Sequence, residues 1–517
     1  MTERTSLVLF VFVAVYIGMA LGRWPWLRMD RTGIAVLGAI ILYATGVIEG
    51  APALAAIDFP TLIVLFGLMI LSAQFAACGF YDWCSAHVAG LRASPTTILA
   101  LTVIVAGVLS AVLANDVVVF AMTPMLINGL VRRGLDPRPY LIALAGAANA
   151  GSAATVIGNP QNILIGQVGR LDFWDFLLVC GPPAAVGLLS VFAVVWTVWR
   201  RRFVNGTARD DEVDWPRLDP FGTGKAIVAT TALLAMFATR LSHVTGVLII
   251  AAVLLFSRRL ATREILGLVD WHLLMLFAGL FIVTAALAET GLPTELLAGF
   301  TEAGLDPRGL PALVPLTLIG SNTIGNVPIV VLLLAVLKDL PTGTLYALAS
   351  LSTLAGNLLI VGSLANIIVV ERAKQVGVVL GFAEHARCGV PMTLISFAAA
   401  VAFRSSGHDH SGCCAGVAPS VAVASGVATA AAGAVAAAVA SVVVAGVSVV
   451  GVADVVSLII FTKRVVVLLS LPSVGDCRGI GCGLCSEFCL FLGSLGFGIC
   501  LVLSRFFSSG ACFRNFL

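Results

Sequence analysis

Polar residues and helix breakers interrupt apolar sequence at four places in this chain of 517 residues. LANDV carries Asn115 and Asp116, and SNTIGN occupies 321–326, while GNPQN occupies 158–162 and Gly-Ser stands at 362–363. Amide, hydroxyl and carboxylate oxygens bind cations, and exposed N–H groups at helix starts bind anions. The four places are therefore candidates for binding a small ion. The candidate substrate or ion ligands are Asn115, Asp116, Ser152, Thr155, Gly158, Asn159, Asn162, Ser321, Asn322, Thr323, Asn326, Gly362, Ser363 and Asn366.

Proline and glycine explain how the backbone breaks at these places. Pro160 lacks an N–H donor and clashes with the preceding helical turn, and Gly158 allows the backbone to unwind. Backbone groups freed inside hydrocarbon need protein, water or an ion as partners. Packing or kinking alone is the alternative explanation for such residues in a transmembrane helix. Gly362 repeats the pattern, again with an asparagine four residues later, which favours a binding site.

Asp116 is the carboxylate among these candidates, and an ionisable side chain inside a membrane is a functional candidate. It could bind Na⁺ directly or carry a proton, and its alternative role is to cap the helix that starts beside it. Asn115, Asn322, Thr323 and Asn326 share this ambiguity between cap and ligand. The sequence predicts no catalytic residues, no resident metal and no cofactor apart from Na⁺ or H⁺ as the coupling ion.

The composition places all these residues in a membrane protein. Apolar residues make up 59% of the chain and charged residues only 11%, with a mean hydropathy of +1.05. Soluble globular proteins are far more charged, so that class is excluded. The sequence offers no basic patch for nucleic acid, and FGTGKA at 221–226 lacks the spacing of a phosphate-binding loop. Any transport would therefore depend on an ion gradient or a partner, and we expect no enzymatic activity.

Arginine clusters give the orientation, because short cytoplasmic loops accumulate Lys and Arg. Placing all five clusters on the cytoplasmic side requires ten membrane crossings and, in addition, two re-entrant hairpins at 95–130 and 310–338. The clusters are Arg23/Arg28/Arg31, Arg132/Arg133/Arg138, Arg200/Arg201/Arg202, Arg258/Arg259/Arg263 and Arg372/Lys374. The expected crossings lie near 5–21, 33–49, 60–79, 139–169, 174–197, 224–240, 245–257, 270–290, 343–371 and 387–403. The first is interpreted as a span rather than a cleavable signal.

An internal repeat supports this arrangement. Residues 57–79 align with 269–291, which pairs Asp58 with Asp270 and Gly67 with Gly279; capping of helix starts explains both aspartates. Further alignments pair Asn115 with Asn326, Gly158 with Gly362, and Asn162 with Asn366. Five crossings and one hairpin in each copy would leave the second copy inverted, an arrangement typical of secondary transporters.

The predicted fold class is an all-α polytopic membrane protein of about ten transmembrane helices in two inverted five-helix repeats, each with a re-entrant hairpin and a broken helix. The repeats occupy 1–200 and 224–403, with a cytoplasmic linker at 201–223. Residues 404–517 form an atypical hydrophobic, Cys-rich tail that is interpreted as low-complexity sequence or as sequence translated out of the ancestral reading frame, with further spans as the alternative. Two weak metal-like groups fall in this tail, namely His408/His410/Cys413/Cys414 and Cys477/Cys482/Cys485/Cys489.

The motifs at the four breaks resemble those of the ion transporter superfamily, which includes arsenite permeases and citrate or divalent-anion symporters. The chain is most similar to its bacterial branch of anion permeases. The resemblance covers roughly 1–403 and is carried by LANDVVVFAMTP, GSAATVIGNPQNILIGQ, GSNTIGNVPIVVLLL and GSLANIIVVERA. It implies that the hairpin tips and helix breaks bind ion and substrate. The symporter branch has Ser-Asn-Thr at both tips, whereas here the first tip is Ala-Asn-Asp at 114–116.

Three functions are compatible with these features. The first is secondary active transport of a small anion, an inorganic oxyanion or a carboxylate, coupled to Na⁺ or H⁺ by alternating access. The second is efflux of an arsenite-type oxyacid or Na⁺/H⁺ antiport, which the lack of Lys and Arg at the tips and breaks keeps open. The third is a membrane scaffold or receptor without flux. The expected location is the plasma (inner) membrane, as a multi-pass protein contacting lipid and an anionic substrate, and a homodimer is possible.

Overall fold

A computed structural model describes residues 3–22, 29–91, 93–203, 216–237, 239, 242–257, 260–302, 306, 308–337 and 339–406. The chain divides into two compact units, residues 1–443 and 444–517, and every described residue belongs to the first. The tail beyond residue 406, with its cysteine and histidine groups, and most of the predicted linker at 201–223 lie outside the described residues.

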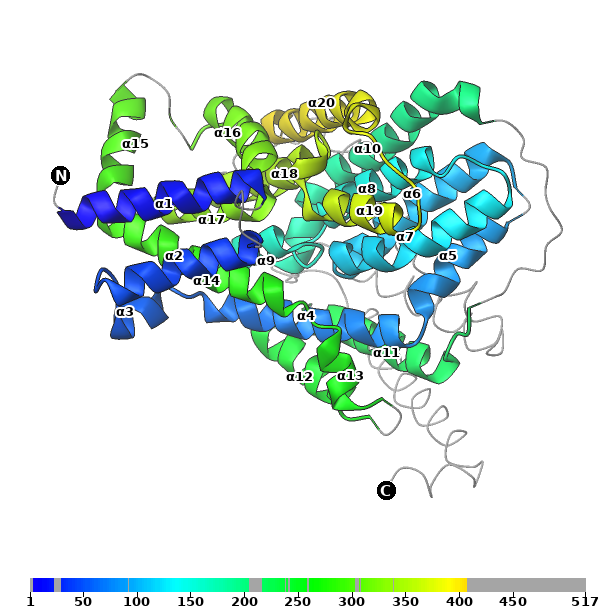
Figure 1. The fold of residues 1–517 in the computed structure, drawn as a ribbon, viewed down its shortest axis with the longest axis horizontal. Coiled ribbons are helices and arrows are strands. Elements are labelled where there is room, and N and C mark those ends of the chain that lie inside the picture. The colour runs from blue at the N-terminus through cyan, green and yellow to red at the C-terminus, as the bar shows by residue number, and fades with distance from the viewer. Residues whose placement is uncertain are drawn as a thin grey trace, which may run out of the picture. The chain divides into compact units, whose positions relative to one another are not determined.

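The described secondary structure is helical throughout (Figure 1). The α-helices are α1 (Glu3–Leu21), α2 (Arg31–Ala44), α3 (Gly50–Ala55), α4 (Phe59–Ala77), α5 (Phe80–Gly90), α6 (Pro95–Val112), α7 (Asn115–Arg132), α8 (Arg138–Ser152), α9 (Pro160–Gly169), α10 (Phe173–Trp199), α11 (Pro220–Phe237), α12 (His243–Leu255), α13 (Thr262–Gly267), α14 (Trp271–Glu289), α15 (Leu292–Glu302), α16 (Leu310–Thr323), α17 (Asn326–Val336), α18 (Thr342–Ala355), α19 (Leu364–Gln375) and α20 (Phe382–Ser406). Two short 3-10 helices are η1 (Arg200–Arg202) and η2 (Ile360–Gly362).

Several of these helices are suited to a bilayer. Within the described residues, seven helices are long and apolar enough to cross it, namely α1, α4, α6, α10, α11, α14 and α20. Helices α2, α12 and α17 are apolar but shorter. The prediction of an all-helical, multi-pass membrane protein is therefore confirmed. Helix α6, expected as one arm of a hairpin, is by itself long enough to span, so the count of crossings and the hairpins remain predictions.

Short and long helices recur in the same order in the two halves of the chain. Helices α3, α4 and α5 have 6, 19 and 11 residues, and α13, α14 and α15 have the same three lengths. Asp58 and Asp270 cap α4 and α14, each accepting a backbone N–H three residues later, as the sequence predicts. Gly79 and Gly291, which precede α5 and α15, both have positive φ, a conformation that glycine adopts without strain.

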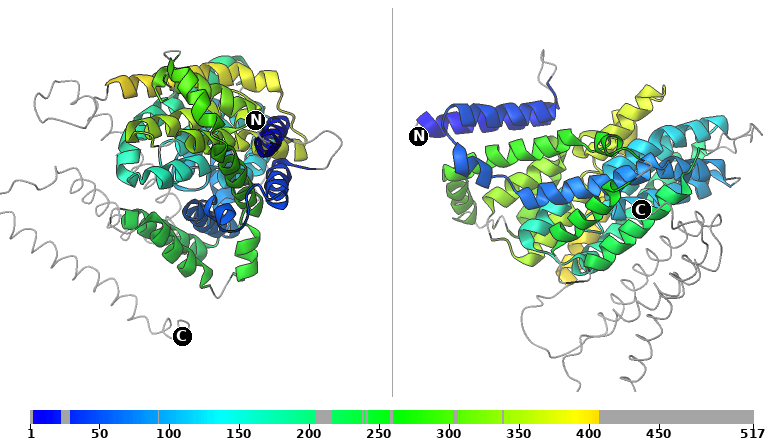
Figure 2. Two further views of the ribbon diagram at one scale, coloured as in Figure 1. Left: turned by 90° about the vertical axis from the view of Figure 1, so that its left-hand side faces the viewer. Right: turned by 90° about the horizontal axis from the view of Figure 1, so that it is seen from below.

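The first group of helices packs through glycines at equivalent positions. Helix α4 packs on α12, and α14 packs on α2 (Figure 2). A Cβ atom at Gly67 would lie 2.2 Å from a methyl carbon of Val247, and one at Gly279 would lie 2.8 Å from the carbonyl carbon of Ala35. Each glycine therefore allows a close approach to a helix from the other half of the chain.

A second group contains the helices that carry the four interruptions. Helices α8 and α10 pack on each other and on α6, and α10 also packs on α20 (Figure 1). Helix α7 packs between α5 and α19, while α9 contacts α17 and α18. Segments distant in sequence thus meet around α8, α9, α18 and α19.

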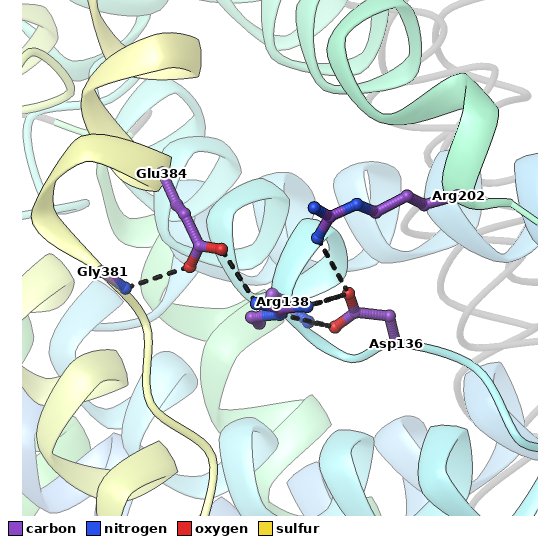
Figure 3. Close-up of polar contacts among 5 residues, drawn as sticks. All are labelled: Asp136, Arg138, Arg202, Gly381 and Glu384. Carbon is purple, nitrogen blue, oxygen red and sulfur yellow. Dashed lines mark hydrogen bonds and ion pairs between the residues drawn. The ribbon is translucent and has the colours of Figure 1, made fainter.

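An ionic cluster ties three of these elements together at one end of α8 (Figure 3). Arg138 donates hydrogen bonds to Asp136 and pairs with Glu384 at 2.8 Å, and Arg202 lies 3.9 Å from Asp136. Burial by itself would raise the pKa of the Asp136 carboxyl, but the hydrogen bonds and charge of Arg138, aided by Arg202, hold that pKa below its ordinary value. The loop before α8 is thereby fixed to the start of α20.

Candidate functional site

The chain leaves helical geometry at each of the four predicted places. Helix α6 ends at Val112 and α7 starts at Asn115, while α16 ends at Thr323 and α17 starts at Asn326. Helix α8 ends at Ser152, eight residues before α9 starts at Pro160, and α18 and α19 are separated by 356–363, which contains η2. The backbone groups of these segments therefore need partners other than a regular helix.

The first break is closed by two asparagines. The Asn159 Oδ1 atom caps α9 by accepting the N–H of Asn162 at 2.9 Å. The Asn162 Nδ2 atom then donates to the carbonyl oxygens of Ser152 and Thr155, at 3.2 and 3.0 Å. One buried amide thus satisfies two carbonyls on the unwound side of the break.

The second break uses the same contacts at equivalent positions. The Asn366 Nδ2 atom donates to the carbonyl oxygens of Gly356 and Leu359, at 2.7 and 3.1 Å. In the register that pairs Asn162 with Asn366, these carbonyls are the counterparts of those of Ser152 and Thr155. The two breaks therefore share a local construction that the alignment alone did not reveal.

Side chains from each broken helix also reach across to the other. The Asn149 Nδ2 atom donates to Asn366 Oδ1 at 3.0 Å, and Thr353 Oγ1 donates to Asn162 Oδ1 at 3.2 Å. The Ser363 hydroxyl donates to Asn149 Oδ1 at 2.8 Å, in correspondence with the 3.2 Å contact between Asn159 Nδ2 and Thr353 Oγ1. Because Asn149 and Thr353 are equivalent in the same register, the cross-contacts form a reciprocal pair. We call the cluster of Asn149, Ser152, Asn159, Asn162, Thr353, Ser363 and Asn366 the amide network.

The amide network is buried and uncharged. Its seven side chains are at most 4% exposed. Three serine and threonine hydroxyls and four amides bond to one another and to neighbouring backbone groups, so the two broken helices are held in register by hydrogen bonds rather than by ion pairs. Within the described residues, no group of three or more His, Cys, Asp or Glu side chains is placed to hold a metal ion.

The segments between α6 and α7 and between α16 and α17 contact the two breaks. The N–H of Asn115 donates to the Gly158 carbonyl at 3.3 Å, and Thr155 Oγ1 donates to the Ala111 carbonyl. In the other half, Asn322 Nδ2 donates to the Ala355 carbonyl at 2.9 Å, and Asn322 Oδ1 accepts the N–H of Leu359. Ser321 Oγ also donates, to the carbonyl of Ser352. All four interruptions consequently lie together.

Glycine is required where these segments meet. A Cβ atom at Gly158 would lie 2.4 Å from the Ser152 carbonyl oxygen and 2.9 Å from that of Ser110. A Cβ atom at Gly362 would lie 2.4 Å from Asn322 Oδ1. Any larger residue would push the chain segments apart at both positions.

Two asparagine oxygens at this meeting point have no partner among the described residues. The Oδ1 atoms of Asn115 and Asn326 are buried, with side chains 4% and 7% exposed, and neither accepts a hydrogen bond. These residues occupy equivalent positions at the starts of α7 and α17. An unpaired buried acceptor is costly, so two equivalent ones call for an explanation.

Asp116 is a partly buried carboxylate in the first turn of α7. The alternative role as a helix cap is wrong, because α7 starts after Ala114 without a side-chain capping bond. No cap is made at the start of α17 by Asn326 either.

Not every candidate residue joins the cluster. Thr323 is exposed, and its hydroxyl bonds to the carbonyls of Ile319 and Gly320 in its own helix. In contrast, Asn149, Thr353 and Asn357 belong to the contacts between the breaks although the sequence analysis did not select them. Extending the repeat register outward from Gly158 and Gly362 would have paired Asn149 with Thr353 and identified both.

The chain is similar in sequence to known membrane transporters. Residues 8–344 match the family described as citrate transporter (CitMHS). An uncharacterized transporter of Mycobacterium tuberculosis is 28% identical over 423 residues, covering 76% of this chain and 96% of the relative. The silicon efflux transporter LSI3 of Oryza sativa subsp. japonica is 26% identical over 444 residues, covering 72% and 91%.

Two further similarities involve a bacterial membrane protein and a solved structure. The inner membrane protein YbiR of Escherichia coli is 32% identical over 323 residues, covering 62% of this chain and 82% of the relative. The crystal structure of the YdaH transporter of Alcanivorax borkumensis aligns with a TM-score of 0.48 at 14% identity, covering 78% of this chain and 98% of that one.

Proposed function

Because the chain belongs to the citrate transporter (CitMHS) family, and is thus a membrane transporter rather than an enzyme, we propose that it performs secondary active transport of a small anion. The substrate would be a carboxylate such as citrate or an inorganic oxyanion, carried with Na⁺ or H⁺ by alternating access. The location we propose is the inner membrane of a bacterium, as the name of the relative YbiR suggests. The observation that carries the proposal is the reciprocal amide network between the two helix breaks.

The network supports a central site shared by two halves. Starts of α9 and α19 face the same cluster, and the positive end of each helix dipole stabilises a nearby anion. Equivalent contacts in the two halves fit two inverted repeats, each with a hairpin (α6 and α7, α16 and α17) and a broken helix. In such an arrangement, one half moves relative to the other while the substrate stays near the membrane centre.

The unpaired oxygens of Asn115 and Asn326 support a coupling cation. Na⁺ prefers oxygen ligands. A bound cation would therefore give each of the two unpaired, buried amide oxygens a partner. The negative charge of Asp116, one residue after Asn115, would favour a cation or proton at the first of these places. Binding the ion would therefore stabilise the backbone turns that shape the anion site.

Transport of an uncharged oxyacid is a second candidate function. The side chains of the amide network carry no charge, so a neutral, hydroxyl-rich substrate could exchange hydrogen bonds with them without desolvating a charge. The name of the relative LSI3, a silicon efflux transporter, and that of a Dictyostelium discoideum relative, putative transporter arsB, agree with this reading. Substrate charge is the property that separates the two candidates.

A flux assay tests the proposal. Purified protein in liposomes would be given an inward Na⁺ or H⁺ gradient and offered labelled citrate, sulfate, phosphate or arsenite. We expect gradient-driven uptake of an anion by the wild type, and loss of ion stimulation in Asn115→Ala and Asn326→Ala. Asn128→Ala, an exposed position on α7, is the matched control. Ion-stimulated flux that survives in both tip variants would refute the coupling role, and uptake of arsenite alone would favour the second candidate.

A further inference from the structure

The Arg372 guanidinium, on α19, stacks on a phenyl ring of α7 further along that helix than the proposed site. The Cζ atom of Arg372, on α19, is 3.9 Å from the centroid of the Phe120 ring on α7. Such a distance places the cation directly on the ring, an attractive arrangement when the group is partly desolvated. Arg372 is partly buried, and Phe120 is 49% exposed. The pair therefore lies at the surface of the described part of the chain.

The hydrogen-bonding capacity of Arg372 is largely unused. Its Nη1 atom donates to Gln375 Oε1 at 3.0 Å, while its Nε atom is buried without a partner. No ion pair within 4 Å involves this guanidinium among the described residues, and Asp82 acts on it only at longer range. The Nη2 atom makes no hydrogen bond to a described residue, so it can donate a charge-assisted hydrogen bond to an oxygen of a carboxylate or tetrahedral oxyanion.

The position of Phe120 connects this cation to the site. Phe120 follows Asp116 by four residues on α7, which places the two side chains on one face of the helix, one turn apart. Arg372 follows Asn366 of the amide network by six residues on α19. Helices α7 and α19 pack together and both start at the site, so Arg372 and Phe120 lie outward of it along the same pair of helices.

In the other half of the molecule, the positions equivalent to Arg372 and Phe120 border a cavity. The repeat registers match Arg372 with Val168 and Phe120 with Val331. Both valines line a cavity of about 200 Å³, together with Leu164, Asp58 and residues of α14. The equivalent positions of the two halves thus differ, since valines border a cavity in one half and a guanidinium stacks on a phenyl ring in the other.

We propose that Arg372 is an anion-receiving residue at one mouth of the transport pathway, where its guanidinium, through Nη2, binds a carboxylate or inorganic oxyanion before it reaches the uncharged amide network. This inference rests on the proposed function and deepens it, because it supplies the cation that the site lacks. It also makes the two mouths chemically different. Anions are received at the end of α19, which the arginine clusters predict to be cytoplasmic, whereas the cavity at the opposite mouth is lined by valines and the Asp58 carboxylate and by no cation among the described residues.

The experiment compares Arg372→Gln, Arg372→Lys and Lys374→Gln in sealed vesicles of both orientations, with citrate, sulfate and phosphate as probes. Lys374 is exposed on the same helical turn, so its substitution removes one positive charge and leaves the Arg372 guanidinium and its stacking on Phe120 in place. For Arg372→Gln we expect KM for the transported anion to rise about 10- to 100-fold, the range for losing a charge-assisted hydrogen bond, with kcat nearly unchanged. The rise should occur only from the face where α19 ends. Arg372→Lys should recover part of the loss, and Lys374→Gln should behave as wild type.

The outcomes separate this inference from the function on which it rests. Normal anion flux with an unchanged KM in Arg372→Gln would overturn the inference and leave the proposed function standing. An equal rise from both faces, or an equal effect of Lys374→Gln, would also overturn it. Failure of the wild type to carry any anion would reject the proposed function itself. Gel filtration and thermal unfolding of each variant show whether it is folded, and Arg372→Lys provides the anion test in a conservative background if the glutamine variant unfolds.

Discussion

Removal of the Asn162 side chain is the strongest single test of the amide network. The amide makes three described side-chain hydrogen bonds, two to the carbonyls of Ser152 and Thr155 and one from the Thr353 hydroxyl. Its counterpart Asn366 also makes three, to two carbonyls and with the Asn149 amide. Replacement by alanine removes three buried hydrogen bonds at either position.

The expected cost follows from these contacts. Each lost hydrogen bond in a buried setting is worth about 1 kcal/mol, so Asn162→Ala should lower the free energy of unfolding by about 3 kcal/mol. Asn366→Ala should cost the same within about 1 kcal/mol, because its contacts are equivalent. Both variants should remain folded but lose most of their transport flux, because the amides also orient the starts of α9 and α19 towards the site.

Thermal unfolding in detergent and flux in liposomes would measure the two effects separately. Asn128→Ala, in which an exposed asparagine on α7 is replaced, controls for the loss of an amide as such. The reasoning would be refuted if Asn162→Ala unfolded like the wild type and retained full flux. A large cost at one asparagine and none at the other would refute the equivalence of the two breaks.

Three further predictions concern other parts of the molecule. Asp136→Asn should cost about 1–2 kcal/mol at neutral pH through its arginine partners. Because the pKa of Asp136 is depressed, this difference from wild type should stay constant from about pH 5 to 8 and disappear only as the pH falls below about 4, which thermal unfolding across pH would record. Gly279→Ala should cost about 1–3 kcal/mol, because the new methyl group meets the Ala35 backbone, whereas Gly224→Ala, with no atom within 4 Å, should be harmless in the same unfolding assay. Asp116→Asn should abolish ion-stimulated flux with little loss of folded protein, and an unchanged response to the gradient would exclude its charge from coupling.

The sequence by itself determined the membrane class, the positions of the apolar helices and the places where they break. Hydropathy dictates that apolar segments become helices in lipid, and Gly158 and Pro160 interrupt a helix wherever it is located, here just before and at the start of α9. Asp58 and Asp270 were assigned correctly as caps because a cap depends only on residues within one turn.

Only the tertiary structure decided which polar groups meet. Asn149 and Thr353 are unremarkable within their own helices, and their role arises because the two breaks face each other and exchange hydrogen bonds. The stacking of Arg372 on Phe120 likewise joins helices separated by most of the chain. Hydrogen bonds and cation–π contacts act over a few ångströms, so local sequence patterns can place each group on its helix but cannot specify its partner.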